Sequence, residues 1–219
     1  MNDLITLGIE TSGILCAVAW WQNDQTLLEY SLEIKNAHST VLADFIKKGH
    51  KTLAIDARSI SLVSVASGPG SFTGLRIGMS FAKGFCMGGN IPLVAVTNFH
   101  VLAALAEKNA QPVYTLIEAR HDRYYTGLFS AKSGVLTKKY VAPKEQLAAE
   151  IPAGAQIIIH EEAHKGTFQK CLPAGRAVVP GDYKSSILCE LGRRIFSEQP
   201  LTPLDDIEPL YLQGFAGVL

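Results

Sequence analysis

Short apolar runs separated by turns occupy the first part of the chain. Leu4–Ile9 and Cys16–Trp21 are mostly apolar, and the turn-rich segment Glu10–Gly13 lies between them. From Thr26 to Ile34 apolar and polar residues alternate, which is the pattern of a strand with one buried face. Three consecutive strands joined by tight turns predict an antiparallel meander.

The hydrophobic period then lengthens. Within Asn36–Lys48, Val41, Leu42 and Phe45 fall on one face of a helix. Further apolar runs and turn residues continue the alternation of elements, so that the N-terminal half is predicted as β-β-β-α-β-α-β-α. These later elements are a strand at Leu62–Ala66, a helix from about Leu75 to Met87, a strand at Leu93–Val96 and a helix that Thr97 or Asn98 caps and that runs to about Lys108.

The second half of the chain has a weaker pattern. A break near Asn109–Pro112 predicts two lobes, residues 1–108 and 109–219, with the last helix as a candidate for packing back on the N-terminal lobe. The expected elements are strands at Val113–Glu118, Tyr124–Phe129, Val135–Val141 and Ala155–Ile159, and a helix at Lys184–Glu198.

Composition and charge restrict the possible partners. The chain has 219 residues, 47% of them hydrophobic, which excludes a disordered protein. It carries 20 Lys and Arg against 20 Asp and Glu, so its formal net charge is zero. A protein that binds tRNA alone usually has a basic excess that neutralises phosphates. Any role in RNA chemistry is therefore expected to run through a partner.

Nothing in the sequence predicts export or a membrane span. Met1–Asp3 is not a basic leader region, and the apolar runs are too short to cross a bilayer. The cysteines Cys16, Cys86, Cys171 and Cys189 form no C-x-x-C pair, so buried reduced thiols are expected. We therefore expect a cytoplasmic protein.

A glycine-rich loop lies between a predicted strand and a predicted helix. Glycines let a backbone approach a ligand closely, and the N-terminus of the following helix favours an anion. A tight turn in which Ser71 or Thr73 caps the helix explains the pattern equally well, and the loop is neither a Walker A motif nor a G-x-G-x-x-G fingerprint. The candidates for a nucleotide or phosphate site are Gly68, Gly70, Ser71, Thr73, Gly74 and Arg76.

The helix after this loop is apolar on almost every side. Only Arg76, Ser80 and Lys83 form a polar stripe. Such a helix is either buried in the core or covered by another chain. Gly78 and Gly84 would let a neighbouring helix approach closely.

His160-Glu161-Glu162-Ala163-His164 matches the H-E-x-x-H pattern of zinc peptidases. On a helix the two histidines would bind zinc and Glu161 would activate a water molecule. A zinc metallopeptidase is therefore an alternative function, with His160 and His164 as weak candidate ligands. A strand that ends at His160 and a charged turn after it is the simpler interpretation.

Several of these segments together resemble the TsaB (YeaZ) family. The stretch Gly68–Gly78 matches the most characteristic motif of that family. Weaker matches follow the family order, at Ile9–Ser12, Asn36–Leu42 and Ile117–Arg120, with an outline match at Pro209–Leu212. The resemblance implies an α/β fold of the actin-like, ribonuclease H-like type, with duplicated lobes of mixed β-sheets flanked by helices.

The resemblance also implies a role. TsaB proteins are non-catalytic partners of the transferase TsaD and, with the ATPase TsaE, support transfer of a threonylcarbamoyl group to tRNA. The acceptor is the adenosine next to the anticodon in tRNAs that read codons beginning with A. The family implies a homodimer when the chain is alone, indirect contact with tRNA, no required cofactor, and a possible nucleotide at the complex interface.

Two features separate this chain from active members of such folds. Glu10 and Glu118 replace the usual aspartates, and His38 stands without the second histidine that marks the catalytic paralogue. The candidates for the partner interface are His38, Leu42, Phe45, Arg76, Met79 and Lys83. On this assignment, Met79→Glu is expected to weaken partner binding in a chain that still folds.

Overall fold

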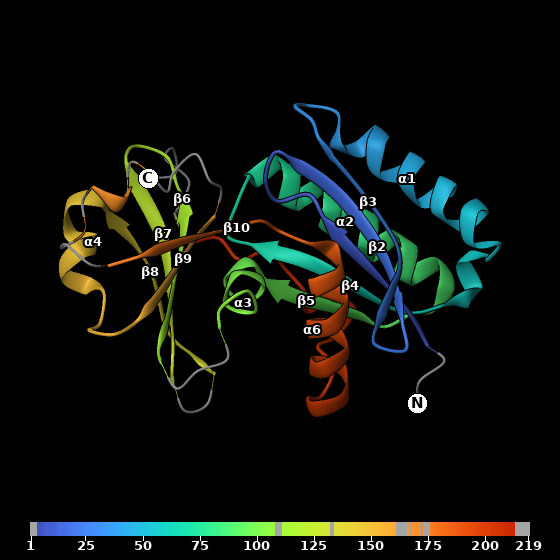
Figure 1. Ribbon diagram of the computed structural model, residues 1–219. Coiled ribbons are helices and arrows are strands. Elements are labelled where there is room, and N and C mark those ends of the chain that lie inside the picture. Colours follow the sequence, from blue (N-terminus) through green and yellow to red (C-terminus); the bar gives the residue numbers. More distant parts are fainter. Residues whose placement is uncertain are drawn as a thin grey trace. The chain divides into compact units, whose positions relative to one another are not determined.

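The computed structural model describes residues 4–107, 111–131, 134–160, 166, 168–170, 172 and 176–212, which form two compact units (Figure 1). The first unit comprises the residues up to Asn98 together with Tyr183–Leu210. The second comprises Phe99–Asp182 and the described residues after Leu210. The chain therefore leaves the first unit at Asn98, before the boundary near residue 108 that the sequence indicated. Within the described ranges, no helix is long and apolar enough to cross a membrane.

The first unit is built on a five-stranded sheet with the strand order β3-β2-β1-β4-β5. The strands β1, β2 and β3 pair antiparallel, which confirms the predicted meander. The strands β4 and β5 run parallel to β1. The bounds are β1 (Ile5–Glu10), β2 (Leu15–Gln22), β3 (Gln25–Glu33), β4 (Ile60–Gly68) and β5 (Leu93–Thr97).

Helices cover both faces of this sheet. Two neighbouring tryptophans show the two sides, because successive side chains of a strand point to opposite faces. Trp20 lies under Gly49 of α1, whereas Trp21 clusters with Ala19 and Cys189 of α6. The helices are α1 (His38–Leu53) and α2 (Phe72–Gly89) on the first face and α6 (Ser185–Glu198) on the second.

The segment Tyr183–Leu210 completes the first unit. Gly8 lies directly under the Ser185 carbonyl of α6, and Gly192 of α6 lies directly over the Ser64 side chain, so the helix sits close to the sheet. Beyond α6, Ile207 joins the core and the Leu210 N–H donates to the Ser67 carbonyl at 2.7 Å. Two short 3-10 helices also belong to this unit, Ala57–Ser59 and Leu204–Asp206.

The second unit repeats the topology of the first. Its sheet has the order β10-β9-β6-β7-β8, with an antiparallel meander followed by two parallel strands. The chain enters through α3, which ends at Ala103, so the helix predicted to reach about Lys108 is shorter than expected. The bounds are α3 (Asn98–Ala103), β6 (Val113–Glu118), β7 (Arg123–Phe129), β8 (Leu136–Pro143), α4 (Lys144–Glu150), β9 (Gln156–His160) and β10 (Val178–Gly181).

Two of these elements were missing from the sequence prediction. The helix α4 has seven residues, too few to show a clear helical period. The strand β10 has four residues and contains Pro180, and proline in a short run argues against a strand. It forms at the edge of the sheet because β9 supplies a parallel partner, which is a non-local contact.

The closeness of α6 to the sheet yields a stability prediction. In Gly192→Ala the new methyl group would meet the Ser64 hydroxyl and lie 2.7 Å from Ser64 Cβ. We expect a loss of about 1–3 kcal/mol in the free energy of unfolding, because overpacking forces a tight interface apart. Gly84→Ala on α2 is the matched control, since its added carbon has no neighbour within 4 Å in the described part of the chain. The free energy of unfolding of that variant, measured with urea, should increase by about 0.5–1 kcal/mol. Equal effects of the two substitutions would contradict the packing assigned to α6.

Candidate functional site

The turn after β1 and the loop after β4 meet at one edge of the first sheet. Because β1 and β4 are parallel neighbours, their carboxyl ends lie side by side, which is where open α/β sheets place their ligand sites. The Ser71 N–H donates to the Ser12 carbonyl at 2.6 Å. The Thr11 hydroxyl donates to the Gly74 carbonyl at 2.8 Å. The sequence-predicted loop is therefore seated on the turn that follows β1.

The glycines of the loop are required by this seating. A side chain at Gly70 would collide with the Ser12 carbonyl, and one at Gly74 with the Thr11 carbonyl. Gly68 has a φ of +97°, a conformation that other residues rarely adopt. The space next to these glycines is thus filled by the protein's own backbone.

Ser71 caps the helix that follows. Its hydroxyl accepts from the Gly74 N–H at 3.3 Å, and its carbonyl accepts from the Leu75 N–H at 2.8 Å. These contacts match the tight-turn interpretation, in which Ser71 is the N-cap. Thr73 and Arg76 are exposed, and the Arg76 guanidinium lies 3.9 Å from the centre of the Phe72 ring.

A buried acid lies beneath the loop. The side chain of Glu10 is fully buried, and its Oε1 accepts from both the N–H and the hydroxyl of Ser12. Burial raises the pKa of Glu10 to about 7, although the bonds from Ser12 partly oppose this. Asn98, which the sequence indicated only as a possible helix cap, donates to the Ser12 hydroxyl at 2.6 Å and to the Pro69 carbonyl at 3.0 Å. Glu118, the other acid that departs from the family pattern, is an exposed residue at the end of β6.

Three of the predicted interface residues are buried. Leu42 is 0% exposed, Met79 4% and His38 8%, because the faces of α1 and α2 that carry them are turned toward the sheet. Their assignment to a surface is therefore corrected. A glutamate in place of Met79 would put a carboxylate in the core, so that variant cannot separate binding from folding. Phe45 is half-buried against Tyr30.

The surface of α2 is formed by other residues. Met87 is 70% exposed, and no atom of the described residues lies within 4 Å of a carbon added at Gly84 or Gly88. Lys83 is half-buried and donates to the Asp205 carbonyl at 3.2 Å. We define the outer face of α2 by the residues of this side, which are Arg76, Ile77, Ser80, Phe81, Gly84, Met87 and Gly88.

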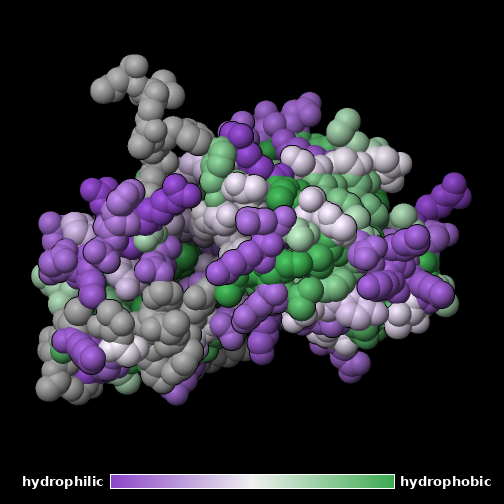
Figure 2. All heavy atoms as spheres, turned by 90° about the horizontal axis from the view of Figure 1, so that it is seen from above, coloured by the Kyte–Doolittle hydropathy of each residue, from purple (hydrophilic) through white to green (hydrophobic). Residues whose placement is uncertain are grey.

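Hydrophobic surface is visible on the first unit. Figure 2, seen from the side on which α1 lies in Figure 1, shows hydrophobic atoms in green gathered over that unit among hydrophilic atoms in purple. Sequence alone identified the small and apolar residues of α2, but it could not separate those that face outward from those that face the sheet.

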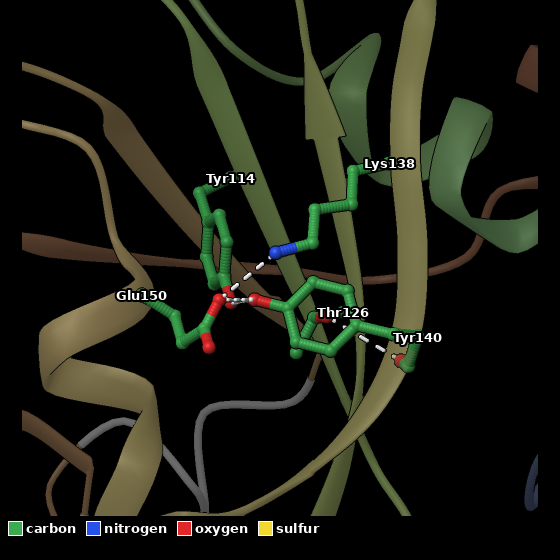
Figure 3. Close-up of polar contacts among 5 residues, drawn as sticks. All are labelled: Tyr114, Thr126, Lys138, Tyr140 and Glu150. Carbon is green, nitrogen blue, oxygen red and sulfur yellow. Dashed lines mark hydrogen bonds and ion pairs between the residues drawn. The ribbon is translucent and has the colours of Figure 1, made fainter.

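The second unit holds a separate polar cluster (Figure 3). The buried Tyr114 hydroxyl lies 2.6 Å from the Tyr140 hydroxyl, which donates to Glu150 at 3.0 Å. Lys138 donates to the same carboxylate at 3.1 Å. The side chains satisfy one another and connect α4 to the edge strand β8.

The zinc-peptidase motif is only partly visible. His160 is the last residue of β9, whereas Glu161 and His164 lie outside the described residues. Within the described ranges, no group of three His, Cys, Asp or Glu side chains is arranged to hold a metal ion.

The geometry yields a prediction for Asn98. Replacing it with alanine removes both bonds that join the Asn98 side chain to the turn and to the loop. We expect Asn98→Ala to lower the free energy of unfolding by about 1–3 kcal/mol, because the buried partners lose their donor. Urea unfolding would measure this, with Gln25→Ala on the exposed end of β3 as the control. A loss no larger than that of the control would mean that the Asn98 bonds do not hold the site.

Comparisons with known proteins identify the family. The family model described as "TsaD: tRNA N6-adenosine threonylcarbamoyltransferase" matches residues 32–187. The tRNA threonylcarbamoyladenosine biosynthesis protein TsaB of Bacillus subtilis is 32% identical over 130 residues, which are 59% of this chain and 57% of that protein, a little over half its length. The protein of the same name from Escherichia coli is 25% identical over 228 residues, which cover 95% of this chain and 94% of that protein.

A solved structure supports the fold. YeaZ from Pseudomonas aeruginosa has 22% sequence identity and a TM-score of 0.79, with 95% of this chain and 100% of that chain covered. Together with the two mixed sheets of repeated topology, this confirms the predicted actin-like, ribonuclease H-like α/β fold. The chain therefore belongs to the family that the matching model describes and, within it, to the TsaB (YeaZ) group of actin-like proteins.

Proposed function

We propose that this chain is an accessory subunit in the transfer of a threonylcarbamoyl group to tRNA. Its partner is a TsaD-like transferase, and the acceptor is the adenosine next to the anticodon in tRNAs that read codons beginning with A. Relatives that align with 59% and 95% of the chain are named as proteins of threonylcarbamoyladenosine biosynthesis. The family model is named for the transferase itself.

The geometry at the sheet edge supports an accessory role. An enzyme of this fold needs acidic and phosphate-binding groups that a substrate can reach. In this chain Glu10 is buried against Ser12, and backbone fills the space beside Gly70 and Gly74. These groups are therefore engaged in holding the turn and the loop together.

The outer face of α2 is the surface that we propose for the TsaD-like partner. The observation that carries this proposal is the open space at Gly84 and Gly88 beside the 70% exposed side chain of Met87. Small residues let a partner helix approach closely. Covering a partly apolar face removes it from water, which stabilises the complex. When the partner is absent, a second copy of the chain covers the same face as a homodimer.

The remaining components act through this assembly. A TsaE-like ATPase binds the complex, and tRNA contacts it chiefly through the transferase, as the zero net charge of this chain favours. The chain needs no cofactor of its own, and a nucleotide bound at the complex interface would meet the exposed residues Thr73 and Arg76. We place the chain in the cytoplasm, because tRNA modification takes place in that compartment.

Reconstitution tests the function directly. The TsaD-like and TsaE-like proteins of the same organism are mixed with tRNA, ATP and a threonylcarbamoyl-adenylate source, with and without this chain, and modified adenosine is measured. We expect modification only when the chain is present, and none from the chain alone. Modification that proceeds equally well without it would overturn the proposal.

The proposed surface is tested by adding bulk to it. Gly84→Trp fills the open space on α2, and we expect at least a tenfold weaker affinity for the TsaD-like partner because the helices can no longer approach. Glu190→Trp, at an exposed position of α6 on the other face of the sheet, is the matched control. Titration calorimetry gives both affinities, and circular dichroism checks the fold. Weakening by both variants, or by neither, would exclude the outer face of α2 as the binding surface.

A further inference from the structure

Glu10 and Asn98 leave two buried oxygen atoms unsatisfied around one serine. Glu10 Oε1 accepts from the Ser12 N–H at 2.5 Å and from the Ser12 hydroxyl, whereas Oε2 has no hydrogen-bond partner among the described residues. Asn98 uses its amide N–H groups on Ser12 and Pro69, and its Oδ1 is likewise buried without a partner in the described part of the chain.

The inventory of donors favours a neutral acid here. An ionised carboxylate and an amide oxygen can only accept hydrogen bonds, so neither can satisfy the other. A protonated carboxyl adds one donor to a cluster that holds two unsatisfied acceptors. Burial acts in the same direction, because it raises the free energy of the charged form.

Among the described residues, no buried lysine or arginine lies with Glu10 to oppose this. The elements packed against β1 are β2, β4, α2 and α6. The buried ionisable groups that the described residues of these elements place against β1 are Cys16 of β2 and Cys189 of α6. Burial raises the pKa of both thiols. Arg76 of α2 is exposed. Arg193 of α6 lies over Trp21, which pairs with Thr6 at the far end of β1 from Glu10.

The residues after Glu10 support the partner helix. The Ser12 carbonyl accepts from the Ser71 N–H, and the Thr11 hydroxyl donates to the Gly74 carbonyl. The first turn of α2 begins at Phe72, so it rests on this contact. A change in the hydrogen bonds of Ser12 would therefore alter the contacts that position the loop and the start of α2.

We propose that Glu10 is a proton switch beneath the glycine loop. As a neutral acid it holds Ser12 and, through Ser12, the loop and the first turn of α2. Loss of the proton leaves an unpaired charge buried under the loop. The carboxylate accepts more strongly from Ser12, but opening of the turn and the loop to water becomes more favourable because opening solvates this charge. The consequence for partner affinity rests on the function proposed above, whereas the switch itself is a property of this chain alone.

The sign of the effect on stability follows from the direction of the shift. The pKa of Glu10 rises from 4.5 to about 7 in the folded chain, so as pH rises the unfolded chain loses its proton first. Stability due to this group is therefore complete below pH 4.5 and falls as pH rises toward 7. His50 acts with the opposite sign, because burial lowers its pKa from 6.5 and acidification forces a charge into its aromatic surroundings.

The titration is measured on the full chain by carbon-13 NMR of labelled glutamate carboxyls. We expect one carboxyl to titrate near pH 7, and its signal to be absent from Glu10→Gln. Glu29→Gln is the matched control, since that half-buried carboxylate of β3 instead accepts from the Ser185 N–H at 2.8 Å. A wild-type chain in which every glutamate titrates near 4.5 would overturn the switch, whether or not Glu10→Gln folds.

Amide hydrogen exchange then tests the mechanical link. After correction for the intrinsic rate, protection of the Ser71 and Gly74 amides should fall at least tenfold from below to above the titration midpoint. In Glu10→Gln the protection of these amides should be independent of pH. In Glu29→Gln it should keep the pH dependence of the wild type. Protection that stays constant in the wild type would show that ionisation does not reach the loop.

Partner affinity forms the last part of the test. The wild-type chain should bind the TsaD-like partner more weakly above the midpoint, and Glu10→Gln should remove that dependence. If the chain binds no such partner, the proposed function fails while the NMR and exchange results still decide the switch. If it binds with an affinity independent of pH, the link from Glu10 to the partner surface is wrong.

Discussion

The contact between the turn after β1 and the loop after β4 determines how the first unit is arranged. Backbone carbonyls of Thr11 and Ser12 lie where side chains of Gly74 and Gly70 would otherwise be, so the loop can approach only because it is glycine-rich. Ser71 then starts α2 at a fixed point above the sheet. The direction in which α2 presents its outer face follows from this contact.

The first unit also depends on residues from the other end of the sequence. The helix α6 packs on the face of the sheet that α1 and α2 leave open, and close approach at Gly8 and Gly192 leaves no space between helix and sheet. Ile207 then joins the core on the side of α2. A surface that binds a partner has to keep its shape when it is covered, and support from behind the sheet gives α2 that rigidity.

The α/β fold of this chain is one that enzymes also use, but the edge of its sheet differs from a ligand-binding site. In open α/β folds the carboxyl ends of parallel strands are where ligands bind. Here the same edge holds a buried acid, a capped helix and an asparagine that joins them. Function therefore has to be inferred from surfaces and charge states, since fold alone does not fix it. The outer face of α2 and the ionisation of Glu10 are the two features of this chain that carry such an inference.

Much of the fold could be read from the sequence, because hydrophobic periods of strands and helices are local and the motif Gly68–Gly78 is specific. The candidate site was only partly predictable. The helix α2 is apolar on nearly every side and has no period that tells core from surface, so Met79 was assigned to the wrong side. Asn98 meets Ser12 across 86 positions of sequence, and no local pattern reports such a contact. The sequence by itself determined the elements and the family. The tertiary structure alone decided which side chains are buried and which charges lose their solvent, because burial depends on segments that are distant along the chain.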